Sequence, residues 1–259
     1  MKRQEKYVLF FLFFILLVIR LYHLGVPPLE IEESWRQADT ESMAWNFANY
    51  DFNPFHPNLN YDGPLPNIPA LEIQVTTFLI AILYKLFGHH YFLARLVPLL
   101  FFLISAFYLY LFARLHMSWR RAAVSVLVYG ILPINIYYSR AIMPESAALM
   151  FWIGGLYYFN LWTMGLAKKG EAKGLRGLLA RSSLLLSLAI MTKPPVIFIA
   201  IPMLYLCFES VQWKWLRIPD LWAYAFFTLA LPATYYYFST SLAEYKFTLG
   251  IGQGIILKK

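Results

Sequence analysis

The chain is a series of apolar segments joined by short polar ones. The first apolar segment covers residues 7–24, and seven more follow at 73–87, 93–113, 122–138, 147–166, 178–191, 194–208 and 221–238. Repeated apolar runs of nearly the length that crosses a bilayer are typical of multi-pass membrane proteins. The pattern therefore predicts an all-α fold, a polytopic transmembrane helical bundle that forms a single membrane domain over residues 1–259.

The segment 73–87 is the exception in this series. If it crossed the membrane, the basic residues of 114–121 and 167–181 would lie outside. If it does not cross, both basic loops lie in the cytoplasm, as the positive-inside rule requires. A helix of its length reaches roughly 22 Å, which is short of the ~30 Å hydrocarbon core. We therefore predict about seven spans, with 73–87 as an interfacial helix inside an outer loop at 25–90 that carries such helices.

The N-terminal segment has the basic start and apolar run of a secretory signal, but no small-residue cleavage site follows it. We interpret it as an uncleaved first span, with Lys2, Arg3 and Lys6 on the cytoplasmic side. These assignments predict a multi-pass protein of the plasma (inner) membrane with a cytoplasmic N-terminus. Its active face is then the periplasmic or extracellular one.

The composition agrees with a membrane protein. Hydrophobic residues make up 60% of the chain and charged residues only 14%, against about a quarter in soluble domains. The net charge of +8 needs no nucleic-acid partner, because the basic residues lie in short clusters between apolar runs. The single cysteine, Cys207, excludes an intrachain disulfide, and no Cys/His spacing indicates a metal site.

The densest polar cluster, EESWRQADT at residues 32–40, directly follows the first span. Ser34 and Gln37 fit a capping box, which predicts a helix that begins at Trp35. Arg36 and Asp39 then share one face of that helix. The cluster is either a solvated, well-capped loop helix or a carboxylate held at the membrane surface for catalysis.

Two further polar groups reach the same outer face in the seven-span topology. In SRAIMPESAALMF (139–151), Arg140 and Glu145 flank a helix start, and they form either a structural pair or a site for an anionic substrate. Lys193 lies at a Lys-Pro-Pro helix break, where it is either functional or a lysine that snorkels to the interface. Glu72 lies near the end of the proline-rich segment 62–74. It is a candidate residue of an acceptor-binding loop.

Four stretches together resemble the membrane glycosyltransferases of the C-type fold (GT-C), which use a polyprenyl-phosphate sugar donor. This group includes protein O-mannosyltransferases and the aminoarabinose transferase that acts on lipid A. WRQADTESMAWNF is similar to the first-loop acidic motif of a bacterial branch labelled family 39. IPALEIQVTTFLIAILYKLFGHHYFLARL, YYSRAIMPESAALMF and LAIMTKPPVIFIAIP follow in the family's order.

The resemblance implies transfer of a sugar from a polyprenyl phosphate to a hydroxyl of a lipid, glycan or protein at the outer face. Asp39 is the candidate general base, with Glu33 as the alternative, and Glu145 orients the acceptor or a metal. Arg36, Arg140 and Lys193 are candidates for holding the donor phosphate. The implied partners are the lipid-linked donor and membrane lipids; a divalent metal is compatible with the residues but not indicated by them.

Family members are longer, so the resemblance also implies that the family's C-terminal part is missing from residues 1–259. We expect these residues alone to bind the donor weakly or not at all, and not to turn over. The competing hypothesis is a non-enzymatic transporter or lipid-carrier-binding protein. A transporter places its polar residues near the membrane midplane, whereas the predicted topology gathers them at one face.

Overall fold

The computed structural model describes residues 3–28, 34–60, 65–169 and 174–243, and these are helical with connecting loops and turns. The long helices are α1 (Arg3–Arg20), α4 (Tyr91–His116), α7 (Glu145–Lys169), α8 (Arg176–Thr192) and α10 (Pro219–Leu242). The shorter elements are α2 (Ser34–Asn49), α3 (Val75–Phe87), α5 (Trp119–Ile131), α6 (Pro133–Tyr138), η1 (Pro194–Ile199), α9 (Ala200–Val211) and η2 (Gln212–Arg217). The all-α prediction is therefore confirmed for these residues.

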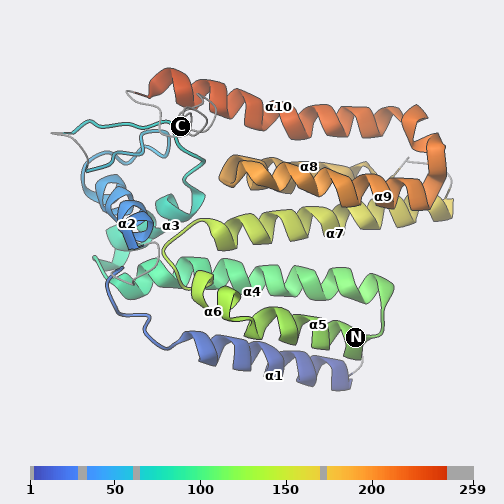
Figure 1. Ribbon diagram of the computed structural model, residues 1–259, viewed down its shortest axis with the longest axis horizontal. Coiled ribbons are helices and arrows are strands. Elements are labelled where there is room, and N and C mark those ends of the chain that lie inside the picture. Colours follow the sequence, from blue (N-terminus) through green and yellow to red (C-terminus); the bar gives the residue numbers. More distant parts are fainter. Residues whose placement is uncertain (1–2, 29–33, 61–64, 170–173, 244–259) are drawn as a thin grey trace, which may run out of the picture.

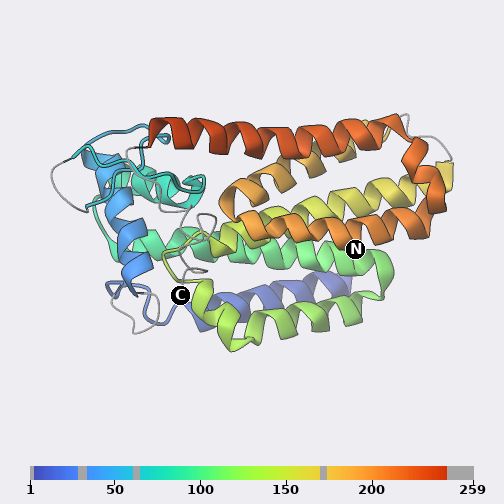
Figure 2. The same cartoon turned by 45° about the horizontal axis from the view of Figure 1, so that its top comes forward.

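The helices form one elongated bundle (Figure 1). Helices α1, α4, α5, α7, α8, α9 and α10 run roughly along its long axis, while α2 and α3 lie together at one end, as Figure 2 also shows. The segment between α6 and α7 and the break between α8 and η1 turn at that same end. All segments that carry the predicted polar clusters therefore meet at the α2–α3 end of the bundle.

Three predicted segment boundaries were wrong. The segment 7–24 is helical only up to Arg20, whose buried guanidinium donates to Ser139 Oγ and to the Gly130 carbonyl, both at 2.7 Å. The segment 122–138 is interrupted between α5 and α6, because Pro133 lacks the N–H that would continue the helix. The segment 194–208 starts as the 3₁₀ turn η1 rather than as an α-helix.

Two of the described helical segments are long and apolar enough to cross a membrane by themselves, Tyr91–His116 and Pro194–Arg217. Helix α3 is apolar but shorter. The count of about seven spans and the interfacial placement of α2 and α3 remain predictions, since length and composition do not decide them.

Helix α7 lies between α4 and α8, and a glycine allows the close approach of α8. A Cβ atom on Gly155 would lie 2.6 Å from Leu186 Cδ2 and Cγ. We expect Gly155→Ala to destabilise the protein by about 1–3 kcal/mol, because a fully buried leucine must move. The measurement is the thermal unfolding midpoint in detergent.

Gly177→Ala on α8 is the matched control for this prediction. No heavy atom lies within 4 Å of a Cβ built on Gly177. The alanine there should leave the midpoint unchanged or raise it slightly, by up to about 1 kcal/mol in stability. Equal midpoints for the two variants would contradict the tight packing of α7 against α8.

Candidate active site

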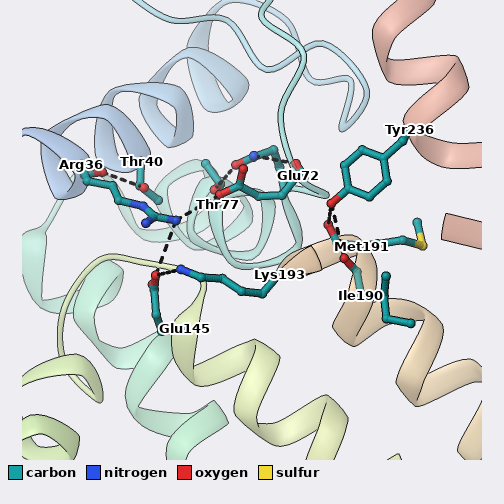
Figure 3. Close-up of polar contacts among 10 residues, drawn as sticks. Arg36, Thr40, Glu72, Thr77, Glu145, Ile190, Met191, Lys193 and Tyr236 are labelled. Atoms are coloured by element: carbon teal, nitrogen blue, oxygen red, sulfur yellow. Dashed lines mark hydrogen bonds and ion pairs between the residues drawn. The ribbon is translucent and has the colours of Figure 1, made fainter. Parts of the chain in front are cut away.

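Four charged side chains from four separate segments meet at the α2–α3 end of the bundle (Figure 3). Arg36 comes from the first turn of α2, Glu72 from the loop before α3, Glu145 from the start of α7, and Lys193 follows α8. Arg36 Nη2 lies 3.3 Å from Glu72 Oε1 and 3.5 Å from Glu145 Oε1. Lys193 Nζ donates to the same Glu145 oxygen. We call these four residues the charge cluster.

Glu145 is the centre of the charge cluster. A single oxygen, Oε1, contacts both cations, and the side chain is only 17% exposed. The other oxygen, Oε2, is buried and has no hydrogen-bond partner among the described residues. The start of α7 also favours an anion there through the helix dipole. Both cations thus contact one oxygen of Glu145, and Arg36 also contacts Glu72.

A buried amide fixes α2 beside this cluster. Gln37 Oε1 accepts from the backbone N–H of Ile142 at 3.0 Å and from Arg95 Nη1 at 3.4 Å. Its Nε2 donates to the Tyr137 hydroxyl at 3.1 Å. Because Arg36 immediately precedes Gln37, these bonds set the position of the Arg36 backbone relative to the segment that leads into α7.

These contacts change the interpretation of the α2 start. The helix begins at Ser34, one residue before the predicted Trp35. The side chain of Gln37, which was expected to cap the helix, is bonded to other elements of the bundle. Glu33, the alternative base, lies outside the described residues.

Asp39 lines a polar cavity next to the charge cluster. The cavity has a volume of about 310 Å³. Its charged and polar lining comes from Arg36, Asp39, Thr40, Glu72 and Gln74, and its remaining walls from Trp35, Met43, Leu59, Leu71 and Pro144. Arg36 and Asp39 were predicted to share one face of α2, and both line this cavity.

A second, apolar cavity of about 320 Å³ lies between α8, α9 and α10. Ile190 and Ile197 line it, and these two residues flank Lys193 in the sequence. Trp215 and Trp222, at the opposite end of α9 and α10, line it as well. The amine of Lys193 thus belongs to the charge cluster, while Ile190 and Ile197 in the same segment line the apolar cavity.

Arg140 takes a different position from the one that its spacing to Glu145 suggested. Its Nη1 donates to the Tyr22 carbonyl at 2.7 Å, and its Nε is buried without a hydrogen-bond partner among the described residues. Its own carbonyl accepts from Arg95 Nη1 at 3.0 Å. Arg140 therefore ties the loop after α1 to the segment before α7, and it has no ion pair with Glu145.

A polar contact that the sequence did not indicate supports the other face of α2. His89 Nε2 lies 2.5 Å from Glu41 Oε1, and the Tyr84 hydroxyl donates to the same oxygen at 3.3 Å. Burial and the nearby Glu41 carboxylate raise the pKa of Tyr84 well above its ordinary value, so Tyr84 remains a neutral donor. Glu41 and His89 are 48 residues apart in the sequence, and no local pattern connects them.

Residues 74–238 match the protein-family model described as dolichyl-phosphate-mannose-protein mannosyltransferase. The chain belongs to this family. The match covers well over half of the sequence and confirms the resemblance to C-type-fold glycosyltransferases. No curated protein and no solved structure matches the chain.

Membership in the mannosyltransferase family has two consequences for the site. The family comprises membrane glycosyltransferases that use a lipid-linked sugar donor, so both an anionic headgroup and an apolar chain need a place. The matched residues include Glu145 and Lys193, whereas Arg36, Asp39 and Glu72 precede them. The fold thus brings Glu145, which contacts Lys193 within the matched region, into contact with Arg36, which lies outside it.

Proposed function

We propose that the protein transfers a sugar from a polyprenyl phosphate to an acceptor hydroxyl at the outer face of the plasma membrane. The observation that carries the proposal is the position of Lys193. Its amine belongs to the charge cluster, and Ile190 and Ile197, three residues before it and four residues after it, line the apolar cavity. A molecule with an anionic head and a long apolar tail fits these two surroundings at once.

Lys193 and Arg36 are the proposed partners of the donor phosphate. Both already contact a carboxylate oxygen of Glu145, and a phosphate presents oxygens of the same kind with more charge. Cations placed where the leaving phosphate gathers charge stabilise the transition state of transfer. Glu145 then shares or yields these cations and is free to orient the acceptor hydroxyl. Arg140 acts on this site only through the backbone that it holds.

The polar cavity is the proposed place of the sugar and the attacking hydroxyl. Its volume of about 310 Å³ is at the small end of the range for ligand pockets, about 300–1,000 Å³. Asp39 lines it and can accept the proton of the acceptor as a general base. Glu72 lines it from the loop side, where it contributes to the acceptor-binding loop.

The charges at the other end of the bundle support the outer-face placement. Arg120 and Arg121 at the start of α5, and Lys214 and Arg217 in η2, all lie at the end opposite the charge cluster. The positive-inside rule assigns that end to the cytoplasm. With seven helical crossings, the charge cluster then faces outward.

Because residues 1–259 alone are expected not to turn over, the test uses them joined to the C-terminal part of a longer family member. It is a transfer assay in membranes from cells that express this joined protein, with radiolabelled polyprenyl-phosphate sugars as donors. We expect label to move into an acceptor fraction and to require an intact Asp39. Membranes without the chain give the background. Transfer at that background level with every donor, or equal transfer by the Asp39→Asn variant, would contradict the proposal.

A further inference from the structure

The C-terminal half of α10 presents hydroxyl groups to the backbone of the site. The Tyr236 hydroxyl lies 2.9 Å from the Met191 carbonyl and 3.4 Å from the Ile190 carbonyl (Figure 3). These carbonyls belong to the last turn of α8, where no further helical N–H groups are available. Tyr236 therefore holds the end of the helix from which Lys193 emerges.

The neighbouring tyrosine holds the other side of the charge cluster. The Tyr235 hydroxyl donates to the Leu71 carbonyl at 3.2 Å, and Ser239 Oγ donates to the same carbonyl at 3.3 Å. Leu71 directly precedes Glu72, the partner of Arg36. Tyr235 thus fixes the backbone next to Glu72 in the way that Tyr236 fixes the backbone near Lys193.

One backbone bond couples these two contacts. The N–H of Ile73 donates to the Met191 carbonyl at 3.0 Å, so that carbonyl accepts from both Ile73 and Tyr236. The loop of Glu72 and the end of α8 are therefore joined directly to each other as well as to α10.

We infer that Tyr235 and Tyr236 are positioning residues, Tyr236 for the donor-binding Lys193 and Tyr235 for Glu72. This inference rests on the proposed function for its effect on transfer. Neither hydroxyl contacts the charge cluster itself, since both bond to main-chain carbonyls. Each hydroxyl therefore holds the main chain beside a different charged residue, although the two tyrosines are adjacent in the sequence.

Three single-oxygen deletions on consecutive residues test the inference. Tyr236→Phe should weaken binding of a short-chain polyprenyl phosphate by about 3- to 10-fold, the effect of one lost hydrogen bond. Tyr235→Phe should leave that affinity within about twofold and raise the KM for the acceptor. Tyr237→Phe is the matched control, because the Tyr237 side chain is 78% exposed. If the two half-buried tyrosines only stabilised the fold, Tyr235→Phe and Tyr236→Phe would change the donor affinity and the acceptor KM alike.

A ligand-free measurement separates this inference from the proposed function. The acylation rate of Lys193 by an amine-reactive ester is measured by mass spectrometry, with exposed Lys85 as the internal reference. Tyr236→Phe should raise the Lys193 rate at least about threefold relative to Lys85, while Tyr235→Phe and Tyr237→Phe leave it unchanged. Equal rates in all four proteins would overturn the positioning role. Absence of polyprenyl-phosphate binding by the wild-type residues joined to the C-terminal part of a longer family member would overturn the donor site instead, and the labelling rates would still decide the role of Tyr236.

Discussion

Asp39→Asn is expected to reduce sugar transfer by at least about 100-fold, since general-base catalysis typically contributes 10²–10⁴ in rate. The asparagine keeps the volume of the side chain and removes only its ability to take a proton. Binding of the donor should persist, because the substitution leaves Arg36 and Lys193, the cations of the charge cluster, in place. The measurement is the initial rate of label transfer in membranes, paired with donor affinity.

Asp51→Asn is the control for this experiment. Asp51 lies in the same outer loop, and its carboxylate contacts His56 at 2.7 Å instead of lining the polar cavity. It should transfer sugar at the wild-type rate. If Asp39→Asn retains more than about a tenth of the activity, Asp39 is not the base, and Glu33→Gln is the next variant to measure.

Lys193→Ala should weaken binding of the polyprenyl-phosphate donor by about 10- to 100-fold. Hydrogen bonds to charged groups contribute about 1.5–3 kcal/mol, and the alanine removes a cation of the charge cluster whose segment also carries Ile190 and Ile197 of the apolar cavity. The difference in affinity between the wild-type protein and the variant should shrink at high salt, because salt screens the attraction between Lys193 and the donor phosphate in the wild-type protein. Affinity is measured with the purified protein in which residues 1–259 are joined to the C-terminal part of a longer family member, in lipid nanodiscs over a series of donor concentrations.

Lys85→Ala provides the comparison for Lys193→Ala. Lys85 is also a single lysine close to the α2–α3 end, but its amine lies 4.2 Å from the centre of the Phe52 ring and takes no part in the charge cluster. Its removal should leave donor affinity unchanged. The same loss of affinity in both variants would indicate a general effect of surface charge and would rule out a specific phosphate site at Lys193.

The sequence predicted which segments would meet, because that depends on topology. Alternating apolar segments and basic loops brought residues 32–40, 140–145 and 193 to one end of the bundle, and the ion pairs of Arg36, Glu145 and Lys193 agree with this. Helix existence was also predictable. The break at Pro133 follows from local chemistry, but the apolar pattern ran through it and hid it.

The partners of each side chain could not be predicted in the same way. Arg140 and Glu145 are five residues apart, yet the guanidinium turns to the Tyr22 carbonyl, a contact between residues 118 positions apart. Glu72 reaches Arg36 because the loop before α3 is held by the end of α8, and this bond involves only main-chain atoms. Side-chain direction and main-chain bonding between distant segments leave no periodic signal in the sequence.

The buried guanidinium of Arg20 has a consequence for the order in which the protein is assembled. Two of its three hydrogen-bond acceptors, the Gly130 carbonyl and Ser139 Oγ, are 110 and 119 residues further along the chain. At a synthesis rate of about 5–20 residues per second, α1 is complete for several seconds, on the order of ten, before these groups exist. The first helix is therefore synthesised before two of the acceptors of its arginine exist, and it reaches its final packing only when α5 and α6 arrive.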